Sequence, residues 1–324
     1  MAVNPPSVQL IDRQTHAKAT APRATSAPNA MPAAGRSLFV TAQDGLRLHV
    51  RAHGTRASSA LPVVCLPGLA RTAADFEDLA LVLSSDRERL VLALDYRGRG
   101  ISDYDRNPAN YNLQVELADL LAVLTALGIG RAAFVGTSRG GILTMLLAVA
   151  RPTAVAGCVL NDIGPVIESD GLMRIKSYVG KLPQPASFRE AADILQRLFG
   201  SHFPKWEDAD WLAFARRTFK EANGRIVADY DPRLATTLAG LTPERPLPPL
   251  WKEFDALACL PVMVVRGTKS DILSQATVKA MRDGRGSLDV VEVADEGHAP
   301  RLTQPQTGSR IAAFIASCDE AAGY

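Results

Sequence analysis

The chain has 324 residues, of which 47% are hydrophobic and 22% charged, as in an ordinary soluble globular protein. Its formal net charge of +2 is too small to attract nucleic acid or an anionic membrane. The longest apolar run, Ile142–Ala150, is far shorter than the roughly 20 residues that a membrane-spanning helix needs. The length allows one large α/β core with a smaller accessory piece.

Residues 1–36 are rich in Ala, Pro, Thr and Ser and show no periodic apolar pattern. Such a segment buries too little apolar surface to offset its ordering entropy, so we predict a disordered N-terminal tail. It lacks the apolar stretch of a secretory signal. Its mildly basic character leaves a transit peptide as an alternative, and translation from Met31 is another.

From Ser37 onward, short β-branched runs alternate with helix-length amphipathic stretches, which is typical of a mostly parallel sheet with helices on both faces. The strands are predicted over Ser37–Thr41, Leu46–Ala52, Pro62–Leu66, Leu90–Leu94, Ala132–Val135, Val155–Leu160, Pro261–Arg266 and Leu288–Val293. The helices are predicted over Ala73–Ser85, Leu113–Leu127, Gly141–Ala150, Ser274–Met281 and Gly308–Ala316. Asp44-Gly45 predicts a tight turn that joins the first two strands in a hairpin.

The alternation stops between residues 165 and 249, where there are helical stretches but no convincing strand. We predict a helical cap there, inserted into an α/β core of residues 37–164 and 250–324. The three tryptophans in or beside this stretch either pin the cap to the core or line an apolar substrate pocket; they are Trp206, Trp211 and Trp251. The candidate pocket residues are Trp206, Trp211, His202 and Arg71.

The four cysteines stand far apart and form no C-x-x-C pair; they are Cys65, Cys158, Cys259 and Cys318. This spacing indicates neither a zinc site nor a disulfide framework. It fits a reducing compartment, and we expect a cytoplasmic protein.

Gly136-Thr137-Ser138-Arg139-Gly140 matches the pattern G-x-S-x-G and lies between the predicted strand Ala132–Val135 and the apolar helix from Gly141. The motif requires this strand–turn–helix setting, because the tight turn presents a serine hydroxyl at the edge of the sheet. Glycines on either side keep Cβ atoms out of the crowded turn. The motif therefore predicts Ser138 as a nucleophile.

A serine hydroxyl becomes a good nucleophile when a neighbouring base accepts its proton. Of the five histidines, His298 stands in the turn after the last predicted strand, at the same sheet edge as Ser138. We predict it as the general base. His16 lies in the tail, and we interpret His49 and His53 as surface or edge residues of the hairpin.

The imidazole needs a carboxylate to fix its tautomer. Asp271 follows the strand Pro261–Arg266 and gives the chain order Ser…Asp…His that accompanies this motif. Asp162 follows Val155–Leu160 and gives the same order, so it is the alternative. We favour Asp271, because its strand comes directly before that of the histidine, and expect Asp162 to cap the start of the inserted segment.

Acyl transfer also needs two backbone N–H groups that bind the oxyanion. We predict those of Arg139, the residue after the nucleophile, and of Leu69 in the loop that begins at Pro67-Gly68. Arg71 and Arg139 bring positive charge close to the predicted site. They either form salt bridges between loop and cap or meet an acidic group of the substrate.

These features resemble the α/β-hydrolase fold family from about Ser37 to Ala316, and are closest to its bacterial esterase, enol-lactonase and cofactor-free haloperoxidase-like branch. The run Asp95–Asp103 is similar to the family's loop after its fourth strand, and Val159–Gly164 to the run that leads into its cap. Pro67-Gly68 departs from the His-Gly of many members. Ser138 stands where epoxide hydrolases and haloalkane dehalogenases carry aspartate, which disfavours their chemistry.

The residues and the resemblance imply a serine hydrolase that cleaves a carboxylic ester or lactone through a Ser-His-Asp triad and an acyl-enzyme, with no metal or cofactor. The same triad also suits carbon–carbon bond hydrolysis, acyl transfer or perhydrolysis, since pocket shape decides among them. A ligand receptor with slow turnover is an alternative of another class. The expected partner is a small ester or lactone, with no nucleic acid and no membrane; the sequence determines neither the natural substrate nor the oligomeric state.

Overall fold

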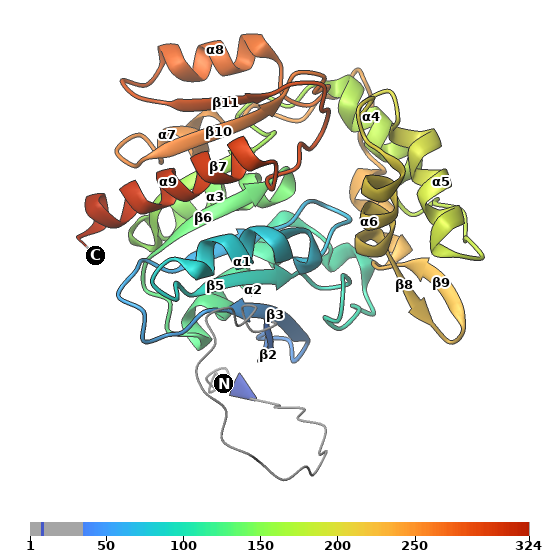
Figure 1. The fold of residues 1–324 in the computed structure, drawn as a ribbon, viewed down its shortest axis with the longest axis horizontal. Coiled ribbons are helices and arrows are strands. Elements are labelled where there is room, and N and C mark those ends of the chain that lie inside the picture. The colour runs from blue at the N-terminus through green and yellow to red at the C-terminus, as the bar shows by residue number, and fades with distance from the viewer. Residues whose placement is uncertain (1–7, 10–34, 324) are drawn as a thin grey trace, which may run out of the picture.

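A computed structural model describes residues 8–9 and 35–323, which form a nine-stranded sheet with helices around it (Figure 1). The strands are β1 (Val8–Gln9), β2 (Arg36–Thr41), β3 (Arg47–His53), β4 (Val63–Leu66), β5 (Val91–Asp95), β6 (Ala132–Thr137), β7 (Val155–Asn161), β10 (Val262–Gly267) and β11 (Asp289–Val293). Their spatial order is β1-β2-β3-β5-β4-β6-β7-β10-β11. Pairing is antiparallel from β1 to β5 and parallel from β5 to β11, which confirms the predicted sheet.

Helices cover both faces of this sheet, as the sequence predicts. One face carries α1 (Glu77–Ser85) and α9 (Pro305–Ala322). The other carries α2 (Leu113–Ala126), α3 (Arg139–Ala150), α7 (Trp251–Asp255) and α8 (Gln275–Asp283). Within residues 8–9 and 35–323, no helix is both long enough and apolar enough to cross a membrane.

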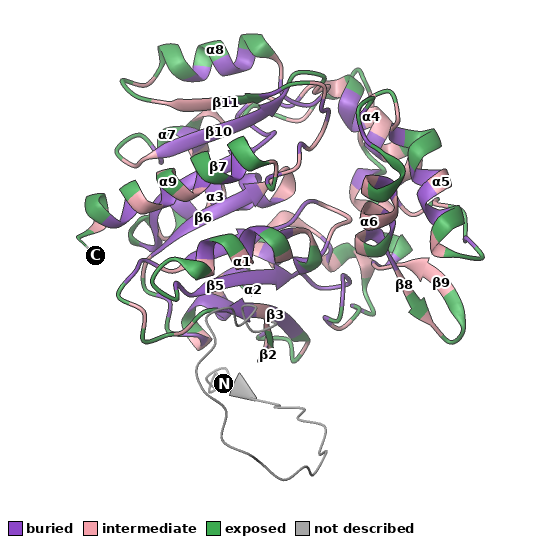
Figure 2. Ribbon diagram, in the orientation of Figure 1, coloured by how far each residue is buried: buried purple, intermediate pink, exposed green. Residues whose placement is uncertain are grey.

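The central strands are buried on both faces, which accounts for their almost continuous apolar runs. In β4, Val63 and Cys65 point toward α1 and α9, whereas Val64 and Leu66 point toward the opposite helices. Figure 2 shows β5, β6, β7 and β10 as almost entirely buried ribbons. Because an apolar run ends where burial ends, the predicted strand boundaries differ from the observed ones by no more than two residues.

The predicted opening hairpin is formed by β2 and β3, which pair antiparallel. At its turn Gly45 adopts a φ of +86°, in the left-handed region that favours glycine. On its other edge β2 pairs with β1, with Val8 opposite Val40. Apart from residues 8–9 and 35–36, the tail predicted to be disordered lies outside the described residues.

Between β7 and α7 the chain forms a layer beside the sheet (Figure 1); it coincides with the predicted cap, and we refer to it by that name. Its elements are α4 (Ser169–Tyr178), α5 (Phe188–Phe199), α6 (Asp208–Thr218), β8 (Phe219–Ala222), β9 (Arg225–Ala228) and the 3-10 helix η4 (Pro232–Leu238). The expectation of a cap without strands is wrong, because β8 and β9 form a hairpin. Asn223 and Gly224 adopt φ of 52° and 70° at its turn, and Asn-Gly strongly favours such a turn. The flanking strands are too short to show an alternating apolar pattern.

A buried ion pair ties the last helix to the sheet. Asp319 on α9 accepts hydrogen bonds from Arg89 at 2.7 and 2.8 Å and from the Leu61 N–H at 3.0 Å. Arg87 also contacts Asp319. The two arginines differ in burial, because the side chain of Arg89 is 1% exposed and that of Arg87 is 41% exposed.

We expect Arg89→Met to lower the free energy of unfolding by about 3–5 kcal/mol. The substitution leaves the Asp319 carboxylate buried without the charge and the two hydrogen bonds of Arg89. The matched variant Arg87→Met should lower the free energy of unfolding by at most about 1 kcal/mol, because Arg87 is 41% exposed and Asp319 keeps its hydrogen bonds from Arg89. Urea titrations followed by circular dichroism measure both values. Equal losses in the two variants would contradict the structural role of Arg89.

Candidate active site

The turn between β6 and α3 holds Ser138 in an unusual backbone conformation, with φ of 52° and ψ of −113°. A Cβ atom on Gly140 would lie 2.0 Å from the Leu66 carbonyl oxygen, and one on Gly136 would lie 2.5 Å from the Gly141 nitrogen. Real Cβ atoms do not approach so closely, so both positions require glycine. The tight packing presents the Ser138 hydroxyl beyond the end of β6, as the motif predicts.

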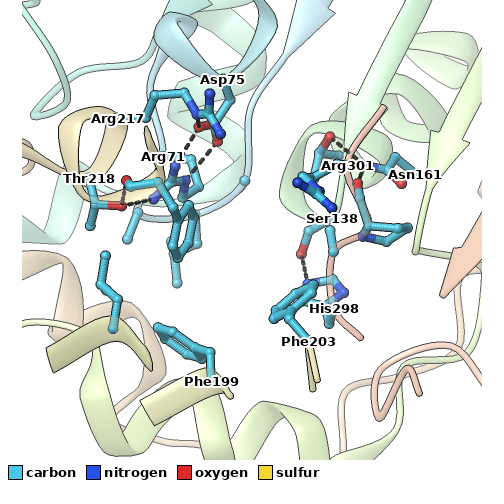
Figure 3. Close-up of a pocket in the computed structure, with 18 of the residues that line it drawn as sticks. Arg71, Asp75, Ser138, Asn161, Phe199, Phe203, Arg217, Thr218, His298 and Arg301 are labelled. Atoms are coloured by element: carbon cyan, nitrogen blue, oxygen red, sulfur yellow. Dashed lines mark hydrogen bonds and ion pairs between the residues drawn. The ribbon is translucent and has the colours of Figure 1, made fainter. Parts of the chain in front are cut away.

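His298 reaches Ser138 from the loop after β11. Its Nε2 lies 2.8 Å from Ser138 Oγ, a contact that Figure 3 marks with a dashed line. Its Nδ1 lies 2.8 Å from Asp162 Oδ2. Asp162 is fully buried and His298 nearly so. The structure thus brings serine, histidine and one carboxylate into a single hydrogen-bonded chain.

Asp162, the alternative acid, makes the contact with His298 that we predicted for Asp271. It directly follows β7 with a φ of 54°, and its carboxylate accepts hydrogen bonds from the Gly267 N–H at 2.9 Å and from Ser270 Oγ at 2.5 Å. Both donors belong to the end of β10 and the loop after it. The neighbouring strand therefore fixes this carboxylate in the orientation that faces the histidine.

Asp271 instead binds the cap, so the prediction that it contacts His298 is wrong. Arg174 on α4 donates to its two oxygens at 2.5 and 2.8 Å. Burial opposes ionisation of this carboxyl, but the hydrogen bonds and the charge of Arg174, together with the nearby His202 and His298, outweigh burial and hold the pKa of Asp271 below its usual range. Asp162 and Asp271 follow adjacent parallel strands and reach the same sheet edge, so chain order could not separate their roles.

Asn161 and Glu296, which are not among the predicted site residues, hold the His298 loop. Asn161 Nδ2 donates to Thr137 Oγ1 and to the Pro300 carbonyl oxygen, both at 3.1 Å. Glu296 is buried and accepts hydrogen bonds from the Trp206 indole at 3.1 Å and from the backbone N–H of Arg301 at 2.7 Å. The only sequence signal was proximity, since each lies within two residues of Asp162 or His298.

Known proteins share this architecture. The profile of the alpha/beta hydrolase family matches residues 63–308. The chain belongs to this family. The crystal structure of an alpha/beta hydrolase from Novosphingobium aromaticivorans is 42% identical, with a TM-score of 0.81 over 88% of this chain and 99% of the other. A 3-hydroxybutyrate-oligomer hydrolase from Cupriavidus necator is 32% identical over 85% of this chain and 96% of its own. An esterase from Mycobacterium tuberculosis is 28% identical over 67% of this chain and 70% of its own.

Two cavities meet at Ser138 in this α/β hydrolase. The first, of about 170 Å³, has aromatic and charged walls; it is lined among others by Arg71, Asp75, Phe199, Phe203, Trp206, Arg217 and His298. Figure 3 shows Arg71 and Asp75 across this cavity from Ser138 and His298. The second, of about 700 Å³, is mainly aliphatic; it is lined among others by Leu113, Ile142, Ile163, Ile167, Leu172 and Leu241.

The predicted pocket residues divide into two groups. Trp206 and Arg71 line the first cavity, whereas Trp211 and His202, although they lie in the described part of the chain, line neither cavity. Trp211 is buried against Trp206, with ring centroids 4.8 Å apart, so it belongs to the interior of the cap. Trp206 does both things that the sequence analysis proposed, since it pins the cap to Glu296 and lines the cavity. Trp251 begins α7 and packs against the core.

Arg71 connects the predicted oxyanion loop to the cap. Its Nε donates to Asp75 at 2.7 Å, and its Nη1 donates to Thr218 on α6 at 2.5 Å. Arg71 thus links the loop to the cap through the hydrogen bond to Thr218, whereas its salt bridge is with Asp75, outside the cap, and not with the cap as the salt-bridge interpretation expected. In the same loop, the Leu69 N–H donates to no acceptor among the described residues, and the same holds for the Arg139 N–H at the start of α3. Both amides are thus free to bind a substrate oxygen.

A second Ser–His–Asp chain lies on β2, β3 and β5. His49 Nδ1 is 2.7 Å from Asp95 Oδ2, and its Nε2 is 3.1 Å from Ser37 Oγ. The interpretation of His49 and His53 as surface or edge residues is wrong, because β3 pairs on both sides and both histidines are buried. Ser37 lies inside a regular strand and lines neither cavity at Ser138. It therefore lacks the tight turn and the space that surround Ser138.

We expect a fluorophosphonate probe to label Ser138 and not Ser37, because only Ser138 combines a partner histidine with an open cavity. Mass spectrometry of tryptic peptides identifies the labelled serine. Ser138→Ala should abolish labelling and Ser37→Ala should leave its rate unchanged. A label on Ser37 would contradict this expectation, because it would show that the Ser37–His49–Asp95 contacts are enough to make a serine reactive without a cavity.

Proposed function

We propose that this α/β hydrolase is a serine hydrolase that cleaves a carboxylic ester or lactone through an acyl-enzyme. The observation that carries the proposal is the continuous chain from Ser138 Oγ through His298 to Asp162, with 2.8 Å at each link. Such a chain lets an alcohol oxygen lose its proton as it attacks. The half-buried serine at the junction of two cavities can receive a substrate from either one.

In the proposed first step, Ser138 Oγ attacks the carbonyl carbon while its proton passes to His298 Nε2. The resulting oxyanion accepts hydrogen bonds from the N–H groups of Leu69 and Arg139. When the tetrahedral intermediate collapses, the bond to the leaving alkoxide breaks and His298 returns the proton to that oxygen. Asp162 keeps the proton on Nδ1, so that Nε2 is free to accept, and it stabilises the imidazolium.

In the second step, water attacks the acyl-enzyme with His298 again as base. The bond between Ser138 Oγ and the acyl carbon breaks, the hydroxyl is restored, and the carboxylic acid leaves. For a lactone the acyl and alcohol parts remain one molecule, which is released as the hydroxy acid. Every step uses side chains, the two backbone N–H groups and water.

The substrate that we propose is an aliphatic ester of a hydroxy acid. The relative from Cupriavidus necator is named for 3-hydroxybutyrate oligomers and is 32% identical over most of both chains. The two cavities support this choice, since an ester carbonyl at Ser138 leaves one cavity for the acyl part and one for the alcohol part. The aliphatic walls of the larger cavity suit a short hydrocarbon portion.

The choice of acid is testable with a matched pair of variants. Asp162→Asn should lower kcat by about 10⁴-fold, because an amide stabilises the wrong histidine tautomer. Asp271→Asn should leave kcat within about tenfold, because it weakens a partly exposed pair with Arg174. Steady-state kinetics on 4-nitrophenyl butyrate measures both. A larger loss in Asp271→Asn would assign the acid to Asp271 after all.

We expect the purified protein to hydrolyse the linear dimer of 3-hydroxybutyrate, with release of acid followed in a pH-stat. Ser138→Ala should lower kcat by up to ~10⁶-fold, and adding His298→Ala should lower it little further, because the residues act as a unit. Additive losses would argue against the triad. Binding of esters without turnover by the wild type would instead favour the ligand-receptor alternative.

A further inference from the structure

Two arginines and one glutamate form a buried ion cluster beside the proposed oxyanion hole. Arg99 Nη1 lies 2.8 Å from Glu116 Oε1, and Arg139 Nε lies 2.5 Å from Glu116 Oε2. The side chains of Arg99 and Glu116 are 0% exposed. Glu116 lies on α2, Arg99 in the loop after β5, and Arg139 at the start of α3. The cluster therefore joins three segments that are distant in the sequence.

The same cluster holds the loop that carries the other proposed donor. Arg99 Nε donates to the carbonyl oxygen of Leu69 at 2.8 Å. The Gly68–Leu69 peptide, which carries the Leu69 N–H itself, is held as well. Its carbonyl oxygen, that of Gly68, accepts a hydrogen bond from the Arg71 N–H at 3.3 Å. With both flanking peptides restrained, the direction of the Leu69 N–H is fixed. A chain of contacts thus runs from Leu69 through Arg99 and Glu116 to Arg139.

Fold stability alone is a poor explanation for this cluster. Burying ions is costly, and apolar side chains of similar size often serve stability as well or better. The cluster also holds two guanidinium groups against one carboxylate. Arg99 Nη2, Arg139 Nη2 and Glu116 Oε1 are buried and have no aligned hydrogen-bond partner among the residues that the structure describes, so Arg99 and Glu116 meet as an ion pair. Such an arrangement is expected where a precise geometry matters more than the energy of burial.

The carboxylate at the centre of the cluster remains charged. Burial opposes its ionisation, but the guanidinium groups of Arg139 and Arg99 outweigh burial and hold the pKa of Glu116 below its usual range. An ionised carboxylate can bind both arginines at once through its two oxygens. A neutral amide at this position would keep the shape of the side chain but lose the charge that both arginines require.

We propose that Glu116 and Arg99 are positioning residues of the oxyanion hole: they set the separation between the Leu69 loop and the start of α3, so that both N–H groups meet one oxygen atom. This inference rests on the proposed serine-hydrolase function. The hole acts mainly on the transition state, because its donors are aimed at the oxyanion and not at the ground-state carbonyl. Losing the cluster should therefore lower kcat and leave KM nearly unchanged.

The principal test is Glu116→Gln, assayed on 4-nitrophenyl butyrate and with an alkylboronic acid, whose tetrahedral adduct with serine mimics the oxyanion. We expect kcat to fall by about 10–100-fold and the inhibition constant of the boronic acid to rise by a similar factor, somewhat less than the loss of one complete donor. KM should change by less than about threefold, as expected when only transition-state binding is lost.

Asp119→Asn is the matched control. Asp119 also lies on α2, is buried, and binds an arginine through both oxygens, but the other side-chain contacts of its partner Arg97 are with Asp44 and Asp105 and not with the Leu69 loop. The Arg97 carbonyl oxygen, which accepts a hydrogen bond from Arg99 at 2.8 Å, is unchanged by the substitution. This variant should lose stability while it keeps kcat and boronic-acid affinity. Equal catalytic losses in Glu116→Gln and Asp119→Asn would reduce the role of Glu116 to general support of the fold and overturn the proposal.

A second variant keeps the test decisive if Glu116→Gln fails to fold. Arg99→Lys retains the charge but loses the planar fork that contacts Leu69 and Glu116 together. It should show the same separation of kcat from KM. A folded Arg99→Lys or Glu116→Gln protein with wild-type kcat and boronic-acid affinity would refute the positioning role. Absence of wild-type esterase activity, or its persistence in Ser138→Ala, would instead refute the proposed function itself.

Discussion

The close approach of β6, α3 and the end of β4 is the constraint on which the rest of the site depends. No Cβ atom fits at Gly136 or Gly140, and the chain passes between them only with Ser138 at positive φ. This turn directs the hydroxyl to the junction of the cavities and leaves the first N–H of α3 without an intrahelical acceptor. Because the contact of Gly140 is with Leu66, the same packing also sets where the loop carrying Leu69 begins. This packing thus places the candidate nucleophile and the first N–H of α3, and it fixes where the loop of the second candidate donor begins.

Around His298, side chains of the core bind side chains of the cap. Glu296 fixes the loop of His298 and also accepts the indole N–H of Trp206 from the cap. Asp271 extends from the end of β10 to Arg174 on the first cap helix. The position of the histidine and the shape of the first cavity are therefore coupled. A change in the cap can be expected to alter substrate binding and the alignment of His298 together.

Arginines in the polar loop after β5 are buried and anchor other loops. Arg97 binds Asp119 and Asp105, while Arg99 joins Leu69 to Glu116. The guanidinium group suits this use because it stays ionised and donates in several directions within one plane. For Arg139, the salt-bridge interpretation from the sequence fits the structure, although its partner Glu116 belongs to α2 and not to the cap.

The sequence by itself determined the strands and helices of the core from β2 onward, the β6–α3 turn, and the pairing of Ser138 with His298, because apolar periodicity and glycine spacing are local and parallel strands end at one edge. It wrongly favoured Asp271 over Asp162, since both follow adjacent strands at that edge and chain order does not separate them. Only the tertiary structure decided which carboxylate contacts His298. Gly267 and Ser270 orient Asp162 toward the histidine, whereas Arg174 binds Asp271. The cluster around Glu116 was equally invisible, because its contacts join residues far apart in the chain and leave no periodic trace.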